Sequence, residues 1–139
     1  MLNQNLKASI LLVFISGLFF NLAFSNDSSR SYLYVSFTTD NFVGVEFRAY
    51  FDNYTHLFAN IGVNYIKWGV RFSSKSTSGL YISPVAYVDY ESGTYFGLFA
   101  GWSTTISNLN NLQFFVEGGA TKIPQKPESI VVLGIVLRF

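Results

Sequence analysis

Cysteine is absent from this chain of 139 residues, and charged residues make up only 12% of it. Without cysteine there is no disulfide framework, no thiolate metal site and no cysteine to carry a lipoprotein anchor. An average soluble domain has about 25% charged residues, so the question is which solvent the apolar half of the chain faces. Once Lys7 is set aside with the expected leader, eight basic residues stand against eight acidic ones. This neutral balance gives no electrostatic reason to expect nucleic acid as a partner.

The first 25 residues have the layout of a secretory signal peptide. Lys7 lies in a short polar start, and an apolar run follows at residues 8–24. Ala23 and Ser25 supply the small residues of a cleavage site, so we expect a mature domain at residues 26–139. The alternative is an uncleaved anchor, but polar residues interrupt the run, which falls short of the roughly 20 apolar residues of a membrane-spanning helix.

The remaining chain alternates apolar residues with polar or small ones, and no segment has helical periodicity. Polar, turn-like stretches separate the alternating segments. We expect eight strands, at residues 31–38, 42–51, 57–65, 67–74, 79–91, 94–103, 111–121 and 129–139. An even number of strands returns both termini of a membrane barrel to the same side.

Two places disturb the alternation. Between Tyr65 and Trp68 the phase changes, which predicts a tight hairpin near Ile66 and Lys67; a bulge in one long strand is the alternative. Pro84 lies inside an expected strand although proline cannot donate a ladder hydrogen bond. We therefore expect a bulge or a strand end at Pro84.

Alternate residues of a strand point to opposite faces, and the two faces differ in kind. One face is apolar and uncharged throughout, as in Val43, Val45, Phe47 or Val131, Leu133, Ile135. The other face holds most of the strand glycines, several tyrosines and charges of both signs. The charged residues of this second face are Glu46, Arg48, Arg71, Asp89, Glu117 and Arg138.

Two closed barrels fit such a division. A soluble lipocalin-like barrel would point the apolar set inward around a ligand. A membrane barrel would point it towards lipid and use the glycines to make room in a narrow lumen for rings and charges. Glycines on the charged face favour the membrane barrel. The six charged residues then form a structural lumen cluster, in which the arginines pair with the acids because unpaired buried charge is costly.

The last strand resembles the closing strand of bacterial outer-membrane barrels. Apolar residues alternate back from a terminal aromatic residue, as Phe139, Leu137, Ile135 and Leu133. The mature chain as a whole resembles the small eight-stranded barrels of the OmpA and OmpX kind. The resemblance implies an up-and-down transmembrane barrel in the outer membrane of a Gram-negative-type bacterium, in contact with lipid. It also implies that the barrel-assembly machinery reads the terminal strand.

Catalytic and metal-binding motifs are scarce. His56 is the only histidine, so a serine–histidine–acid site for lipid modification would have to be built on it, and no serine lies at short spacing beside it. A chain with one histidine and no cysteine is poor in zinc ligands. We expect no catalytic residues, cofactor or metal.

The sequence therefore favours a monomeric, non-enzymatic outer-membrane barrel with a structural or surface-interaction role. A secreted lipocalin-like carrier of apolar ligands is the first alternative. A barrel-embedded lipid-modifying enzyme is the second.

Overall fold

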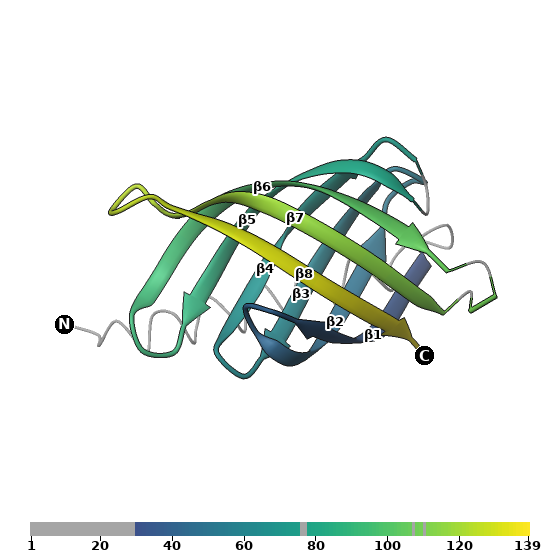
Figure 1. Ribbon diagram of the computed structural model, residues 1–139, viewed down its shortest axis with the longest axis horizontal. Helices are drawn as coiled ribbons and strands as arrows, with labels where there is room; N and C mark the ends of the chain where they lie inside the picture. Colours follow the sequence, from purple (N-terminus) through teal and green to yellow (C-terminus); the bar gives the residue numbers. More distant parts are fainter. Residues whose placement is uncertain (1–29, 76–77, 107, 110) are drawn as a thin grey trace.

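The computed structural model describes residues 30–75, 78–106, 108, 109 and 111–139, which form eight antiparallel strands closed into a barrel (Figure 1). The strands are β1 (Arg30–Thr38), β2 (Phe42–Tyr50), β3 (Thr55–Gly62), β4 (Tyr65–Ser73), β5 (Gly79–Asp89), β6 (Gly93–Thr105), β7 (Leu112–Ile123) and β8 (Glu128–Arg138). The expected all-β barrel of eight strands is confirmed. The predicted signal peptide, residues 1–25, lies outside the described residues.

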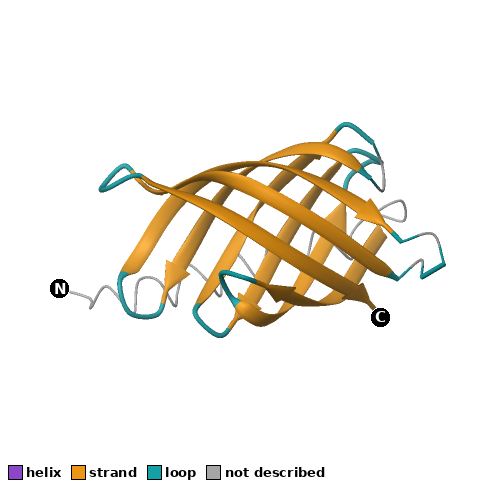
Figure 2. Ribbon diagram, viewed as in Figure 1, coloured by secondary structure: helices purple, strands orange, loops and turns teal. Residues whose placement is uncertain are grey.

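Each strand pairs with its neighbours in sequence, and β1 pairs with β8 to close the barrel. Only Tyr34–Thr38 of β1 meet β8, where they face Gly134–Arg138. Such stagger accompanies strands that are tilted against the barrel axis, and the strands cross the long axis of the molecule obliquely (Figure 2). The topology is the up-and-down order that the sequence predicted.

The two ends of the barrel are named here by what they carry. The turn end holds the connections 39–41, 63–64, 90–92 and 124–127. The terminus end holds the connection 51–54 and the described residues 74, 75, 78, 106, 108, 109 and 111 of two other connections, together with Arg30 and Phe139. The two- and three-residue connections thus lie at the end of the barrel opposite Arg30 and Phe139.

A tight hairpin joins β3 and β4, but its predicted position near Ile66 and Lys67 is wrong, and so is the alternative of one long bulged strand. The turn occupies residues 63–64, and Ile61 faces Ile66 in register across it. The apolar alternation did not indicate the position of the turn because Val63 and Tyr65 continue the alternation through it. As a result Lys67 is not a turn residue but lies within β4.

A residue from another connection holds this turn. The buried side chain of Asn41 accepts hydrogen bonds from the backbone N–H groups of Asn64, at 2.8 Å, and Tyr65, at 3.2 Å. Its amide also donates to the carbonyl of Tyr65 at 3.1 Å. A Cβ atom on Gly62 would lie 2.0 Å from the Asn41 amide nitrogen, so a glycine is needed at this approach.

The expectation of a bulge or strand end at Pro84 is also wrong. β5 runs through Pro84, and its register with β4 is the same on both sides of it, which places Pro84 opposite Val70. Proline has no N–H to donate to Val70, but the hydroxyl of the neighbouring Ser83 donates to the Val70 carbonyl at 3.0 Å. A side chain thus supplies the hydrogen bond that the backbone lacks.

A bulge does occur in β7. Phe96 and Leu98 of β6 face Ile123 and Ala120, so β7 carries one extra residue in this interval. Lys122 takes a positive φ of 58° there. Its backbone N–H donates to the hydroxyl of Tyr87 at 3.0 Å, which connects the bulge to β5, the strand on the other side of β6.

Candidate functional site

The exterior of the barrel is apolar. Every strand exposes at least one large apolar side chain, and none of the outward positions in the described strands carries a charged residue. In β8, Leu133 is 46% exposed and Ile135 is 38% exposed. The exposed large apolar residues of the strands include Leu33, Phe37, Val43, Val45, Ile61, Phe72, Leu80, Ile82, Phe96, Leu98, Trp102, Phe114 and Val131.

The interior holds charge. Arg48 and Glu117 are each 2% exposed, and Glu46 and Arg71 are also buried. Burial of an ionised group is costly unless partners surround it. Each of these four residues belongs to one of two ion-pair clusters along the lumen.

The first cluster is centred on Glu46. Nε of Arg48 lies 2.5 Å from one oxygen of the Glu46 carboxylate, and the amide of Asn60 donates to the other at 3.2 Å. Nη1 of Arg48 donates to the side-chain oxygen of Gln113 across the lumen at 2.7 Å. The guanidinium also lies 4.2 Å from the centroid of the Tyr34 ring. β2 thus contributes an acid and a base from the same inward face.

The second cluster is centred on Glu117. Its carboxylate accepts from Nζ of Lys67 at 2.9 Å and from the hydroxyl of Tyr81 at 2.9 Å, and Nη2 of Arg71 lies 3.6 Å away. The Arg71 guanidinium also lies 4.2 Å from the centroid of the Tyr81 ring. Two neighbouring strands, β4 and β5, therefore converge on a carboxylate from β7.

The structure brings together four of the six residues of the predicted lumen cluster: Glu46 with Arg48, and Arg71 with Glu117. Asp89 instead accepts the backbone N–H groups of Glu91 and Ser92 in the turn after β5. Arg138 lies 4.9 Å from the ring centroid of Tyr32 near the terminus end. Neither Asp89 nor Arg138 takes part in an ion pair found among the described residues.

Lys67 is the functional residue that sequence reasoning missed. The sequence pattern predicts a hairpin turn near Lys67, whereas its inward position on β4 places its ammonium group against Glu117. Its alternation with Gly69 and Arg71, two residues of the charged face, was the signal that would have found it.

Glycines make the lumen wide enough for these side chains. A Cβ atom on Gly134 would lie 2.2 Å from the Phe115 ring, and one on Gly101 would lie 2.6 Å from the Tyr81 ring. Tyr81 in turn donates to Glu117. The glycines of the charged face therefore make room for rings, as the sequence indicated.

His56 lies inside the barrel at the terminus end. It is buried, its ring centroid lies 4.6 Å from that of Tyr50, and it stands between Tyr50 and Arg71 in register. Its Nε2 has no hydrogen-bond partner within the described chain. That nitrogen is therefore not positioned to activate a serine hydroxyl there.

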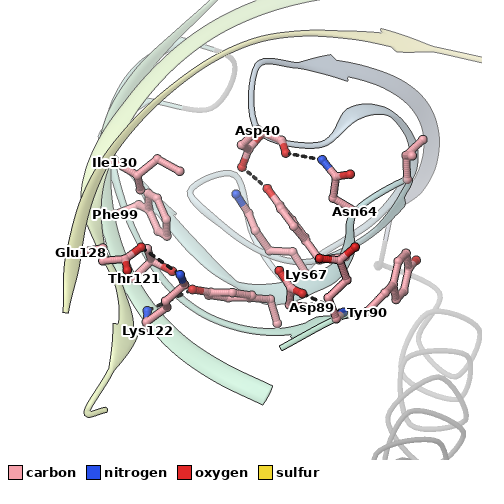
Figure 3. Close-up of a pocket in the computed structure, with 14 residues that line it drawn as sticks. Asp40, Asn64, Lys67, Asp89, Tyr90, Phe99, Thr121, Lys122, Glu128 and Ile130 are labelled. Atoms are coloured by element: carbon pink, nitrogen blue, oxygen red, sulfur yellow. Dashed lines mark hydrogen bonds and ion pairs between the residues drawn. The ribbon is translucent and has the colours of Figure 1, made fainter. Parts of the chain in front are cut away.

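A cavity of about 450 Å³ opens at the turn end of the barrel. Its lining combines charged side chains with aromatic ones (Figure 3). Lys67 stands in the middle of the view, and Phe99 and Ile130 lie together on one side (Figure 3). Because Lys67 also contacts Glu117, it forms the boundary between the cavity and the filled lumen.

The described residues contain no group of three or more His, Cys, Asp or Glu side chains placed to hold a metal ion. They also contain no helix with the length and apolar character needed to cross a membrane.

In comparisons with protein-family models, with curated proteins and with solved structures, no match to this chain was found.

Proposed function

We propose that this chain is a non-enzymatic, monomeric, integral outer-membrane β-barrel with a structural or surface-interaction role. Its N-terminal segment directs export, and the barrel-assembly machinery recognises the last strand through Leu133, Ile135, Leu137 and Phe139. Lipid surrounds the barrel wall, and side chains fill its lumen.

The observation that carries the proposal is the distribution of apolar and charged side chains. Apolar residues are exposed around all eight strands, while Arg48 and Glu117 lie along the axis. A soluble monomer rarely exposes a contiguous apolar patch of more than a few hundred Å². Hydrocarbon favours such a wall, and a closed barrel satisfies every strand hydrogen bond internally, as a membrane requires.

The contents of the lumen argue against an open pore. Tyr34, Phe58, Tyr81, Phe99 and Phe115 are all buried, and the two ion-pair clusters lie among them. An eight-stranded barrel has an interior that side chains can fill. We therefore assign no porin-like channel to it.

The lipocalin-like alternative needs the opposite arrangement. A carrier of apolar ligands buries residues such as Leu133 and Ile135 around its ligand, but both are exposed here. The space that its ligand would need holds buried charges instead. No feature of the described chain favours this alternative.

Fractionation of cells that express the full chain tests the proposal. We expect the mature protein in the outer-membrane pellet, resistant to carbonate extraction and migrating faster in gels when unheated. Full extraction by carbonate, or a monodisperse protein without detergent, would overturn the proposal.

A matched pair of variants tests recognition of the last strand. Phe139 and Phe51 are both exposed at the terminus end. We expect Phe139→Ser to leave much of the protein unfolded and outside the membrane, and Phe51→Ser to assemble normally. Equal assembly of the two variants would contradict the assigned role of Phe139.

A further inference from the structure

The two ion-pair clusters of the lumen carry more positive than negative charge. They contain three basic residues, Arg48, Lys67 and Arg71, but only two acids, Glu46 and Glu117. None of these five side chains is more than 12% exposed. Because Lys67 and Arg71 share the carboxylate of Glu117, one positive charge has no carboxylate of its own. A buried charge without a counter-charge is costly, so an anion held in the lumen would stabilise the barrel.

Two of these basic residues have a buried nitrogen atom without an acceptor. Nη2 of Arg48 and Nε of Arg71 form no hydrogen bond within the described chain, and neither does Nε2 of His56. All three residues are at least 95% buried. Arginine nitrogens only donate, and a neutral imidazole can carry its proton on Nε2. The lumen therefore presents three N–H groups of the kind that a single anion can accept.

The register of β2, β3 and β4 places these three residues next to one another on the inward face. His56 lies directly opposite Arg71, and it is the diagonal neighbour of Arg48, which lies opposite Phe58. In an antiparallel pair, opposite Cβ atoms are about 4.5–5.5 Å apart and diagonal ones roughly 7–8 Å, distances that long side chains span. His56 therefore stands between the two arginines.

The other neighbours of Arg71 do not satisfy its Nε atom. The guanidinium carbon lies 4.2 Å from the ring centroid of Tyr81, 5.2 Å from that of Phe58 and 5.8 Å from that of Phe115. Ring faces attract a cation, but they offer the N–H group no oxygen or nitrogen lone pair. Glu117 contacts Arg71 at Nη2, 3.6 Å away, and not at Nε.

We propose that the lumen binds a chloride ion between Arg48, His56 and Arg71. A monatomic anion accepts hydrogen bonds from any direction, so it suits N–H groups that come from three different strands. The packing also favours the smallest anions, since Phe58 beside these residues is only 1% exposed. Tyr50, whose ring centroid lies 4.6 Å from that of His56, is half-buried. The ion therefore has a short path past Tyr50 from the water at the terminus end.

Unfolding at constant ionic strength tests the proposal. An ion that binds only the folded chain raises the free energy of unfolding as its concentration rises, and this dependence yields its Kd. The folded protein is unfolded by urea in increasing sodium chloride, with sodium gluconate keeping the ionic strength constant. We expect the urea midpoint to rise with chloride and with bromide. The site needs no membrane, so the titration is run in detergent as well as in vesicles, and its result stands apart from the fractionation test above.

Two variants separate a local site from a general response to salt. His56→Phe keeps a ring against Tyr50 but removes Nε2. Loss of one hydrogen bond to a charged group should weaken the affinity for chloride at least about tenfold. Lys122→Gln is the control, because it removes one positive charge at the turn end, where Lys122 pairs with Glu128. We expect Lys122→Gln to leave the affinity for chloride unchanged.

Two results of the titration would refute the proposal: urea midpoints of the unchanged protein that do not respond to chloride, or the same response to chloride in the unchanged protein and in His56→Phe. If His56→Phe does not fold, crystals of the unchanged protein grown in sodium bromide decide. Anomalous scattering should locate a bromide ion among Arg48, His56 and Arg71. Bromide bound only elsewhere, or not at all, would equally refute the proposal.

Discussion

The ammonium group of Lys67 lies 2.9 Å from the carboxylate of Glu117, a residue 50 positions further along the chain. The pair joins β4 to β7 across the lumen, and Arg71 and Tyr81 complete the shell around the acid. Because Glu117 is the acid of this cluster, its two basic neighbours depend on it for compensation of their charge.

Neutralising Glu117 should therefore be costly. Glu117→Gln leaves Lys67 and Arg71 without their counter-charge, and breaking a buried pair in this way costs about 3–5 kcal/mol. Urea unfolding in lipid vesicles, followed by the fluorescence of Trp68 and Trp102, measures the loss. The double variant Lys67→Met/Glu117→Gln should recover part of the stability, since it removes one uncompensated charge.

Glu128→Gln is the matched control for this prediction. Glu128 pairs with Lys122 at the rim, where both side chains are substantially exposed, and surface pairs contribute little. We expect no measurable change in the free energy of unfolding. Equal effects at Glu117 and Glu128 would show that the lumen cluster does not stabilise the barrel.

The hydroxyl of Ser83 should contribute more to the free energy of unfolding than the hydroxyl of an ordinary strand serine. Ser83→Ala removes the donor to the Val70 carbonyl, and an unsatisfied buried acceptor costs about 1–3 kcal/mol. Pro84→Ala restores a backbone N–H opposite Val70. The double variant Ser83→Ala/Pro84→Ala should regain most of the lost stability in urea unfolding. Additive losses would mean that the two residues do not share this acceptor.

Much of the fold could be predicted from the sequence because one physical rule, the alternation of faces, applies along every strand. It identified eight strands and separated the apolar face from the charged one. The rule failed between β3 and β4, where Val63 and Tyr65 kept the apolar alternation through a turn. The side chain of Asn41 stabilises that turn by accepting hydrogen bonds from residues 23 and 24 positions further along the chain. A local sequence pattern carries no information about contacts over such separations.

The candidate site was less predictable than the fold. Alternation placed Arg48 and Glu117 on one face, but the partner of each charge depends on register around the barrel. The contact between Arg48 and Gln113 spans 65 positions, and no local pattern indicates it. The turn-end cavity is lined by residues of three connections and by Lys122 of the β7 bulge, so no local sequence pattern indicates it.

Two adjacent glycines provide a test of the inward and outward faces. A Cβ atom on Gly119 would lie 2.1 Å from the backbone oxygen of Leu98, whereas one on Gly118 would meet nothing closer than 3.8 Å. Gly119→Ala should destabilise the barrel by about 1–3 kcal/mol through overpacking. Gly118→Ala should be neutral or slightly stabilising, because alanine restricts the unfolded chain. Urea unfolding of the two variants compares them directly, and a larger loss at Gly118 would contradict the assignment of faces.

Arginine substitutions on β8 separate a membrane barrel from a soluble one. Leu133 lies near the middle of the strand and Ser129 near its turn end, and both are exposed. If lipid surrounds the wall, Leu133→Arg should cost about 2–4 kcal/mol and Ser129→Arg about 0–1 kcal/mol, because the cost of charge depends on depth in the bilayer. Unfolding in vesicles measures both values. In water an exposed arginine costs little at either position, so two equally small effects would show that Leu133 does not face hydrocarbon.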